Sequence, residues 1–199
     1  MNPIFSAPIE TARLRIRQVE HSDLDALMAL HGDTEVVRYI PHMHWANRAD
    51  ADAWWARALG RREKQSAVQC VVTARMDANS DADEPIVGTL TLFNFEIESG
   101  LAEFGYLLGR VHQNKGYARE AATAFIDFAF ADADAHSGEN RGMGLRRLEA
   151  AVDSRNLASN RLAERLGFVR EGVLRERWLA AGELQNVHLF GLLRREWKQ

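Results

Sequence analysis

The sequence predicts a mixed α/β fold with its helices interleaved among its strands. Segments of strand-like alternation and segments of helical apolar spacing follow one another along the chain. The change from strand to helix period is sharpest around a short glycine-containing segment, Gln113 to Arg119 (QNKGYAR). With 199 residues, the economical interpretation is one domain over residues 1–199.

The N-terminal half predicts three strands and two helices. Leu14 and Ile16 alternate with arginines, as in a half-buried strand. His21-Ser22-Asp23 suits the start of the first helix, and a polar, acidic connection suits a hairpin between the second and third strands. In order, we expect a strand at 14–18, helices at 24–30 and 48–64, and strands at 68–74 and 86–95.

The C-terminal half alternates strands and helices before a final pair of strands. Residues 132–144 are rich in glycine and small polar residues and predict a loop. Gly167 suits the left-handed position after a helix. In order, we expect strands at 101–108 and 147–152, each followed by a helix at 117–129 and 156–166, and last strands at 168–178 and 184–193.

Composition excludes several classes of protein. A net charge of −3 gives no attraction to nucleic acid or anionic membranes, so neither is an expected partner. No signal-peptide core and no membrane-length apolar stretch is present, which makes the cytoplasm the default location. The single cysteine, Cys70, excludes an internal disulfide and is expected to pack in the core. The histidines show no ligand motif, so we expect no metal site.

The segment from Gln113 to Ala118 has the placement of an anion site. It lies where a strand ends and a helix begins, so several backbone N–H groups lack helical partners and can bind phosphate oxygens. Gly116 permits close approach, while Lys115 and Arg119 add charge. By spacing alone, a tight turn is the other interpretation of Gly116. The segment matches neither GxxxxGK[ST] nor GxGxxG, which disfavours kinases, P-loop NTPases and Rossmann dehydrogenases.

Three separated segments together resemble one family. They are AEFGYLLGRVHQNKGYAREA, then LEAAVDSRNLASNRLAERLGFVREGVLRE, then LFGLLRREW. In this order they resemble the GNAT acetyltransferase superfamily, in particular the ribosomal-protein N-terminal acetyltransferases, and residues 11–40 are similar to the start of that branch too. The resemblance implies a mixed, mostly antiparallel central sheet of about seven strands flanked by helices, with acetyl-CoA as co-substrate.

The resemblance also implies a set of cofactor-binding residues. Gln113, Gly116 and Ala118 match the family signature Q/R-x-x-G-x-G/A, which wraps the diphosphate of coenzyme A. The preceding strand would pair with the pantetheine arm, and a bulge in it would supply an N–H to the thioester carbonyl. Asn156 corresponds to an asparagine that contacts the cofactor, although it also suits a helix N-cap. The implied set is Tyr106, Leu107, Leu108, Gln113, Asn114, Lys115, Gly116, Tyr117, Ala118, Arg119 and Asn156.

Two residues are candidates for proton transfer. Glu103 precedes the cofactor loop on its strand and shares a face with Gly105 and Leu107, so it is the candidate base. A solvated or ion-paired glutamate is the alternative. Many family members use a tyrosine as the acid, but Ala163 occupies that position here. The ribosomal-protein branch suggests Ser159 instead, and water is the alternative.

The expected activity is acetyl transfer from acetyl-CoA to a primary amine. The acceptor is a protein N-terminal α-amine or a small amine, and the sequence does not choose between them. A non-catalytic acyl-CoA-binding module is the competing interpretation because of Ala163, and a homodimer is one assembly that the branch allows. His42, His44 and Trp45 suit a surface loop or the border of the acceptor pocket. Of Trp54 and Trp55, one should be core and the other should line the acceptor cleft.

Overall fold

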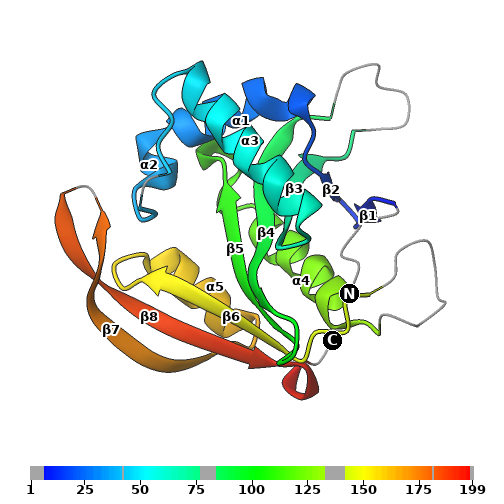
Figure 1. Cartoon of the computed structure of the whole chain (residues 1–199), viewed down its shortest axis with the longest axis vertical. Helices are drawn as coiled ribbons and strands as arrows, with labels where there is room; N and C mark the ends of the chain where they lie inside the picture. Colours follow the sequence, from blue (N-terminus) through cyan, green and yellow to red (C-terminus); the bar gives the residue numbers. More distant parts are fainter. Residues whose placement is uncertain (1–6, 42, 77–83, 133–141, 181, 198–199) are drawn as a thin grey trace.

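A single eight-stranded sheet organises the protein (Figure 1). The computed structural model describes residues 7–41, 43–76, 84–132, 142–180 and 182–197. The strands lie in the order β1-β2-β3-β4-β5-β6-β8-β7. Their bounds are β1 Ile9–Glu10, β2 Leu14–Gln18, β3 Ala67–Ala74, β4 Ile86–Glu96, β5 Leu101–Leu108, β6 Arg147–Asp153, β7 Val169–Ala180 and β8 Glu183–Leu193.

The described residues also form five α-helices and three 3-10 turns. Short turns precede α1 and α4, and a third follows β8. The helices are α1 Leu24–Gly32, α2 Thr34–Val37, α3 Arg48–Glu63, α4 Tyr117–Phe130 and α5 Leu157–Arg165, and the turns are η1 His21–Asp23, η2 Arg110–His112 and η3 Arg194–Glu196.

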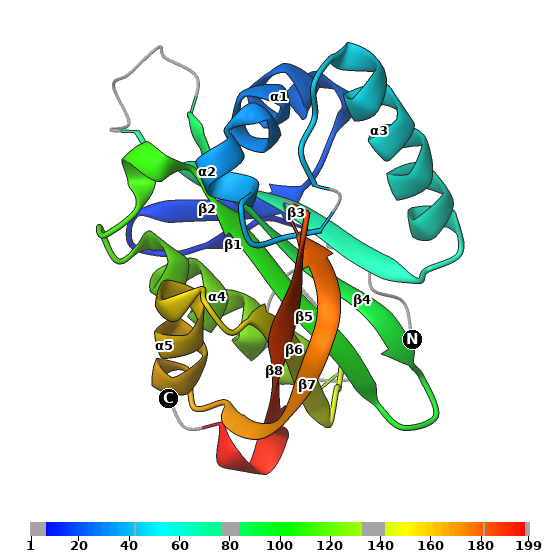
Figure 2. The same ribbon diagram turned by 90° about the vertical axis from the view of Figure 1, so that its left-hand side faces the viewer.

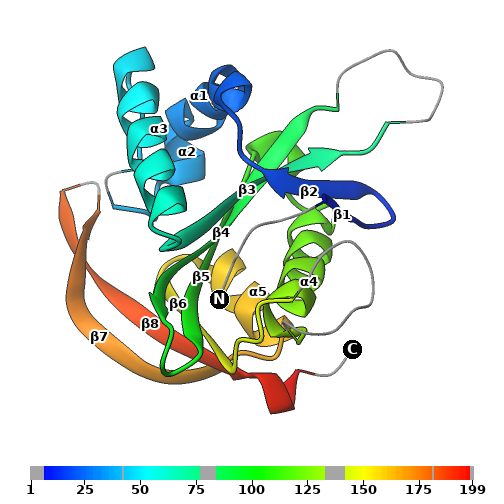
Figure 3. The ribbon, with the colours of Figure 1, turned by 45° about the vertical axis from the view of Figure 1, so that its right-hand side comes forward.

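Helices cover both faces of the sheet. One core cluster joins α4 and α5 to the strands, with Phe104 and Phe125 among its buried side chains. A second joins α1, α2 and α3 to the opposite face, where Val71 and Leu107 are buried. Figure 2 shows α4 and α5 on the side of the sheet away from α1 and α3, and Figure 3 shows α3 and α4 on either side of the sheet. The sheet therefore separates two compartments that side chains of β5 can reach in alternation.

All neighbouring strands run antiparallel except β5 and β6, which are parallel. The mixed, mostly antiparallel sheet is confirmed, and so is the β3–β4 pair expected as a hairpin. The sequence predicted about seven strands, and the sheet has eight. The additional strand, β1, has two residues and pairs with β2, and such a short segment shows no alternation in sequence.

Local signals explain where two helices begin and end. The amide of Ala49 donates to the side chain of Asn47 before α3, and Asp50 accepts from the backbone of Asn47, which forms a capping box. Gly167 follows α5 with φ +88°, the left-handed geometry expected from the sequence. Most of the expected connections at 76–84 and 132–144 lie outside the described residues. None of the helices in the described part of the chain is long and apolar enough to cross a membrane.

Candidate active site

The loop between β5 and α4 carries two left-handed residues, Asn114 with φ +60° and Gly116 with φ +80°. Gly116 is the N-cap of α4 and makes no side-chain cap. The first N–H groups of α4, from Tyr117 to Arg119, have no carbonyl partner within the helix. Together with the helix dipole, these donors make the loop suitable for binding an anion, as the sequence predicts.

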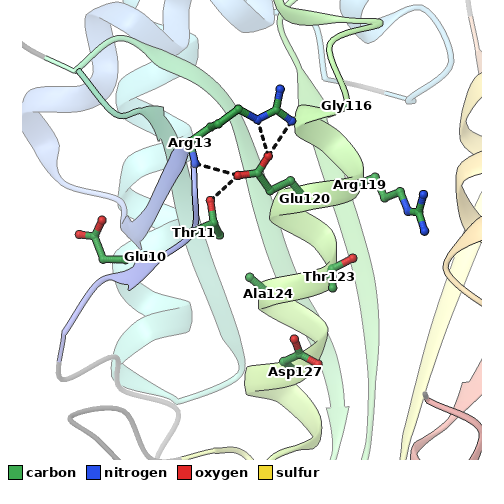
Figure 4. A pocket seen from close by; sticks show the side chains of 9 residues that line it. All are labelled: Glu10, Thr11, Arg13, Gly116, Arg119, Glu120, Thr123, Ala124 and Asp127. Carbon is green, nitrogen blue, oxygen red and sulfur yellow. Dashed lines mark hydrogen bonds and ion pairs between the residues drawn. The ribbon is translucent and has the colours of Figure 1, made fainter. Parts of the chain in front are cut away.

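Neighbouring groups hold the loop from two sides. The side-chain amide of Gln113 donates to the carbonyl of Leu108, 3.2 Å away, and so ties the loop to the end of β5. On the other side, a guanidinium N–H of Arg13 donates to the carbonyl of Lys115 at 2.9 Å. A groove of about 560 Å³ lies beside these contacts, between β1–β2 and α4 (Figure 4).

Strands β5 and β6 separate beside this loop. Their parallel pairing covers three positions, from Leu101 opposite Arg147 to Glu103 opposite Glu149. Beyond these residues the two strands diverge (Figure 1). Both strands are fully described, and the stretch of β5 from Phe104 to Leu108 has no pairing with β6. The residues expected to pair with pantetheine, Tyr106, Leu107 and Leu108, lie in this stretch, where the carbonyl of Leu108 already accepts from Gln113.

The bulge that the resemblance implied in β5 is not present. Over the fully described stretch from Glu103 to Leu108, β5 pairs with β4 in regular register. The irregularity lies on β4 instead, between Phe93 and Glu96, where Asn94 has φ +51°. This turn allows the side chain of Asn94 to reach Glu103 across the strand pair.

Glu103 is half-buried and holds one specific partner. The side-chain amide of Asn94 donates to a carboxylate oxygen of Glu103 at 2.9 Å. Burial raises the pKa of Glu103, the bond from Asn94 lowers it, and the nearby Glu149 carboxylate raises it, with a net upward shift. Glu149 is bound by Arg147 at 2.8 Å, whereas Glu103 accepts from a neutral amide. Glu103 therefore has the raised basicity that suits a general base.

Ser159 meets Tyr106 on the opposite face of the sheet. The two hydroxyl oxygens lie 2.8 Å apart, joining β5 to the first turn of α5. Burial raises the pKa of Tyr106, although its bond to Ser159 opposes the shift, so the phenol stays protonated at neutral pH. Asn156 caps α5 by accepting from the amide of Ser159 at 3.1 Å, which confirms the N-cap interpretation.

The side chain of Tyr106 is a feature that the sequence reasoning missed, because it considered only the backbone of this residue. A second missed group lies behind Asn156. The amide of Asn160 donates to the carbonyls of Asp153 and Asn156 at 3.1 and 2.7 Å, and its oxygen accepts from Nδ1 of His188 at 2.6 Å. Asn160 therefore fixes the turn from β6 into α5. Its position one residue after the candidate Ser159 is the feature of the sequence that could have identified it.

The aromatic cluster between α1 and α3 belongs to the core. Trp45 is 5% exposed and stacks on the buried ring of His31 with centroids 4.0 Å apart, so it is not a surface residue. His44 is exposed, and His42 lies outside the described residues. Trp54 and Trp55 are both partly buried against this cluster, so the expected division into one core ring and one cleft ring is not seen.

Two other expectations concern cysteine and metals. Cys70 is 2% exposed, as predicted for a packed core residue, and burial raises the pKa of its thiol. Within the described ranges, no three His, Cys, Asp or Glu side chains are grouped so that they could hold a metal ion.

The model of the acetyltransferase (GNAT) domain family matches residues 13–169. The chain belongs to the GNAT acetyltransferase family. It is 32% identical over 187 residues to the uncharacterized N-acetyltransferase p20 of Bacillus licheniformis, covering 94% of this chain and 96% of that protein. The residues matched by the family model include β5, the loop and the Asn156–Ser159 turn, so the GNAT resemblance seen in the sequence is confirmed.

Solved structures share the GNAT fold. The ribosomal-protein-S5-alanine acetyltransferase of Vibrio fischeri has a TM-score of 0.75 at 22% identity, covering 97% of this chain and 100% of that one. The spermidine N-acetyltransferase of Vibrio cholerae, solved with CoA and spermine, has a TM-score of 0.76 at 20% identity, with 94% and 98% covered. The family match and the relative p20 make the chain an acetyltransferase. The solved structures show that its fold occurs in proteins named for different acceptors.

Proposed function

We propose that residues 1–199 form one domain that transfers the acetyl group of acetyl-CoA to a primary amine, most favourably a protein N-terminal α-amine. The observation that carries this proposal is the adjacency of an anion-binding loop and the open backbone edge of β5. A diphosphate and a pantetheine arm need these two features side by side. No dinucleotide fingerprint competes for the loop.

The donor would lie along three groups of residues. Backbone N–H groups from Asn114 to Arg119 bind the diphosphate, with Lys115 and Arg119 adding positive charge. The edge of β5 at Tyr106, Leu107 and Leu108 pairs with the amides of pantetheine as an added strand would. Asn156, at the start of α5, contacts the arm while it caps the helix.

Catalysis requires a neutral amine. At pH 7 the deprotonation of an α-amine with a pKa of about 7.8 costs roughly 1 kcal/mol, whereas a lysine with a pKa of about 10.4 costs roughly 4.6 kcal/mol. The amine nitrogen attacks the thioester carbon, and Glu103 accepts its proton directly or through a water molecule. The smaller cost for an α-amine suits a single carboxylate base.

The leaving thiolate requires a proton as the C–S bond breaks. Ser159 gives its hydroxyl proton to the sulfur and regains one from water, and the hydroxide that remains takes up the proton that Glu103 releases, so that both residues end the cycle in their starting states. The bond between Tyr106 and Ser159 supports this role, because a phenol that donates to the serine oxygen leaves the serine proton free to point at the sulfur. This hydroxyl pair takes the place of the tyrosine that Ala163 replaces.

The acceptor belongs to one of two classes. A protein N-terminus is acted on by the ribosomal-protein-S5-alanine acetyltransferase, and a polyamine by the spermidine N-acetyltransferase, both of the same fold. We favour the α-amine because of its lower deprotonation cost and the sequence resemblance to the ribosomal-protein branch. The relatives named N-acetyltransferase favour an enzyme over a non-catalytic acyl-CoA-binding module.

The test is thiol release from acetyl-CoA with a panel of acceptors. The panel contains peptides with free N-termini, the same peptides with blocked N-termini, spermidine and lysine. We expect release with free N-termini and a loss of about 10²-fold or more in Glu103→Gln. Glu63→Gln, an exposed carboxylate at the end of α3, is the matched control and should retain full activity. Binding of CoA without release on every acceptor would instead favour the non-catalytic module.

We also propose a homodimer that forms through β7. This strand is at the edge of the sheet, and Val169, Val173 and Leu179 on it are 57, 49 and 54% exposed. An edge strand presents unpaired backbone groups, and a second copy of the same strand supplies matching ones. Light scattering of the wild type should give the mass of two chains. The Val173→Lys variant should give the mass of a single chain. A wild-type monomer at all concentrations would contradict the dimer.

A further inference from the structure

Arg13, directly before β2, reaches the loop proposed to bind the diphosphate. One guanidinium N–H donates to the carbonyl of Lys115 at 2.9 Å, and Nε donates to Glu120 on α4 at 2.7 Å. The guanidinium also lies 4.8 Å from the ring centroid of Tyr117. Figure 4 shows Arg13 extending across the groove towards Gly116 and Glu120. A single side chain thus contacts the loop and the first turn of α4 together.

Glu120 completes this connection. Besides the hydrogen bond from the Arg13 side chain, Glu120 accepts from the backbone amide of Arg13 at 2.9 Å and from the hydroxyl of Thr11 at 2.6 Å. Partial burial would raise the pKa of Glu120, but these hydrogen bonds outweigh burial and hold the pKa below its ordinary value. The carboxylate is therefore charged at neutral pH and fastens α4 to the N-terminal strands.

The bond to Lys115 sets the direction of a donor in the loop. The described peptide bonds are all trans, and in a trans peptide the C=O and the following N–H point in opposite directions. Since the Lys115 carbonyl points at Arg13, the amide of Gly116 points away from Arg13. Gly116 can adopt many backbone conformations, so this peptide needs an external partner to keep one orientation. Arg13 is that partner.

We infer that Arg13 and Glu120 form a brace that holds the loop in its anion-binding geometry, which makes Arg13 a positioning residue for the cofactor diphosphate. The inference rests on the proposed use of acetyl-CoA. The Arg13 charge is already paired with Glu120 at 2.6 Å, so its contribution is orientation of the loop more than attraction of the anion. The brace also makes the N-terminal strand pair part of the cofactor site.

The experiment compares two donors, acetyl-CoA and acetyl-pantetheine, of which only the first carries a diphosphate. In Arg13→Gln we expect CoA affinity, measured by calorimetry, to fall about tenfold and the KM for acetyl-CoA to rise in parallel. The kcat/KM for acetyl-pantetheine should change less than twofold. A residue with a merely structural role would affect both donors equally.

Arg15→Gln is the matched control. Arg15 lies on β2, is similarly exposed, and is ion-paired to Glu10 at 2.6 Å and to Glu84 at 3.4 Å. Its replacement removes the same charge two residues further along the chain but leaves the loop contacts intact, so CoA affinity should be retained. Equal loss of CoA affinity in both arginine variants would show a general charge effect and would overturn the brace.

Glu120→Gln is the second variant and is measured beside Arg13→Gln. It keeps the Arg13–Lys115 bond, so it should lower CoA affinity less than Arg13→Gln does, and a double-mutant cycle should be non-additive. If Arg13→Gln fails to fold, loss of CoA affinity in Glu120→Gln alone carries the test. Unchanged CoA affinity in both variants would overturn the inference alone. A wild-type chain that bound no CoA would overturn the proposed function as well, which distinguishes the two failures.

Discussion

The hydroxyl groups of Tyr106 and Ser159 lie 2.8 Å apart and connect β5 to the N-terminal turn of α5. They bridge the two elements on either side of the place where β5 and β6 part. A tyrosine on the strand and a serine on the helix thus meet near the position where the family pattern expects one tyrosine on the helix.

We expect Ser159→Ala to lower kcat by about 10²-fold and Tyr106→Phe by about tenfold, because the phenol only orients the serine proton. The KM for acetyl-CoA should change little in either variant. Steady-state kinetics with the double variant provides the check, since two residues that act as one unit give non-additive losses. Additive losses would show that the hydrogen bond has no role in the reaction.

The pH dependence should respond to the two neighbours of Glu103 in opposite directions. Activity falls as the pH drops through the raised pKa of Glu103, because the protonated carboxyl cannot accept a proton. Glu149→Gln removes a negative charge that raises this pKa, so the acid limb of kcat/KM should move to lower pH. Asn94→Gly removes a hydrogen bond that lowers the pKa and tolerates φ +51°, so the limb should move to higher pH. If the acid limb moved in the same direction in both variants, Glu103 would be excluded as the titrating base.

Replacement of Gly116 should weaken CoA binding more than it destabilises the fold. In Gly116→Ala the new Cβ would lie 3.3 Å from the Arg13 guanidinium, at φ +80°. Backbone strain of about 1–2 kcal/mol is expected there. Gly182→Ala is the control, because Gly182 has the same φ with no atom within 4 Å of the added Cβ. Thermal unfolding should change similarly in the two variants, while calorimetry should show lost CoA affinity only in Gly116→Ala.

Protein stability should fall in mild acid because of His31. Burial lowers the pKa of His31 to about 4, although its bond to the carbonyl of Met43 opposes the shift. The folded state therefore resists protonation. The stability from the neutral ring is complete above an unfolded pKa of about 6.5 and is lost as the pH falls from there towards 4, up to about 3 kcal/mol.

The check is chemical denaturation of wild type and His31→Phe between pH 7.5 and 4.5. Phenylalanine can keep the stacking on Trp45 but does not titrate. The unfolding free energy of the wild type minus that of His31→Phe should decrease as the pH falls. A constant difference would mean that His31 does not control this part of the acid sensitivity.

The hydrophobic periodicity and the residues that favour turns predicted most of the fold, because its longer helices and strands carry strong local signals. The helix from Tyr117 and the left-handed Gly167 were both predicted correctly. The two-residue strand β1 and the four-residue helix α2 are too short to show a period, and pairing with β2 and packing beside α1 define them instead.

The candidate site was predictable only where it is local in sequence. The loop from Gln113 to Arg119 and the cap at Asn156 are formed by neighbours in the chain. The bond from Asn94 to Glu103 depends on a strand irregularity, and the bonds from Arg13 and Tyr106 join segments far apart in the sequence. The apolar run around Cys70 predicted its burial correctly, whereas the burial of Trp45 was not predicted because it depends on stacking against His31 of α1.

Glu103 and Ser159 lie on opposite faces of the sheet, one beside Asn94 and the other on α5. If each proton-transfer residue serves the substrate nearest to it, the two substrates enter from different sides and neither blocks the entrance of the other. Bisubstrate kinetics should then give intersecting lines in double-reciprocal plots, with no compulsory order of binding. An acceptor as large as a folded ribosomal protein could dock and depart while the nucleotide end of the cofactor stays in place.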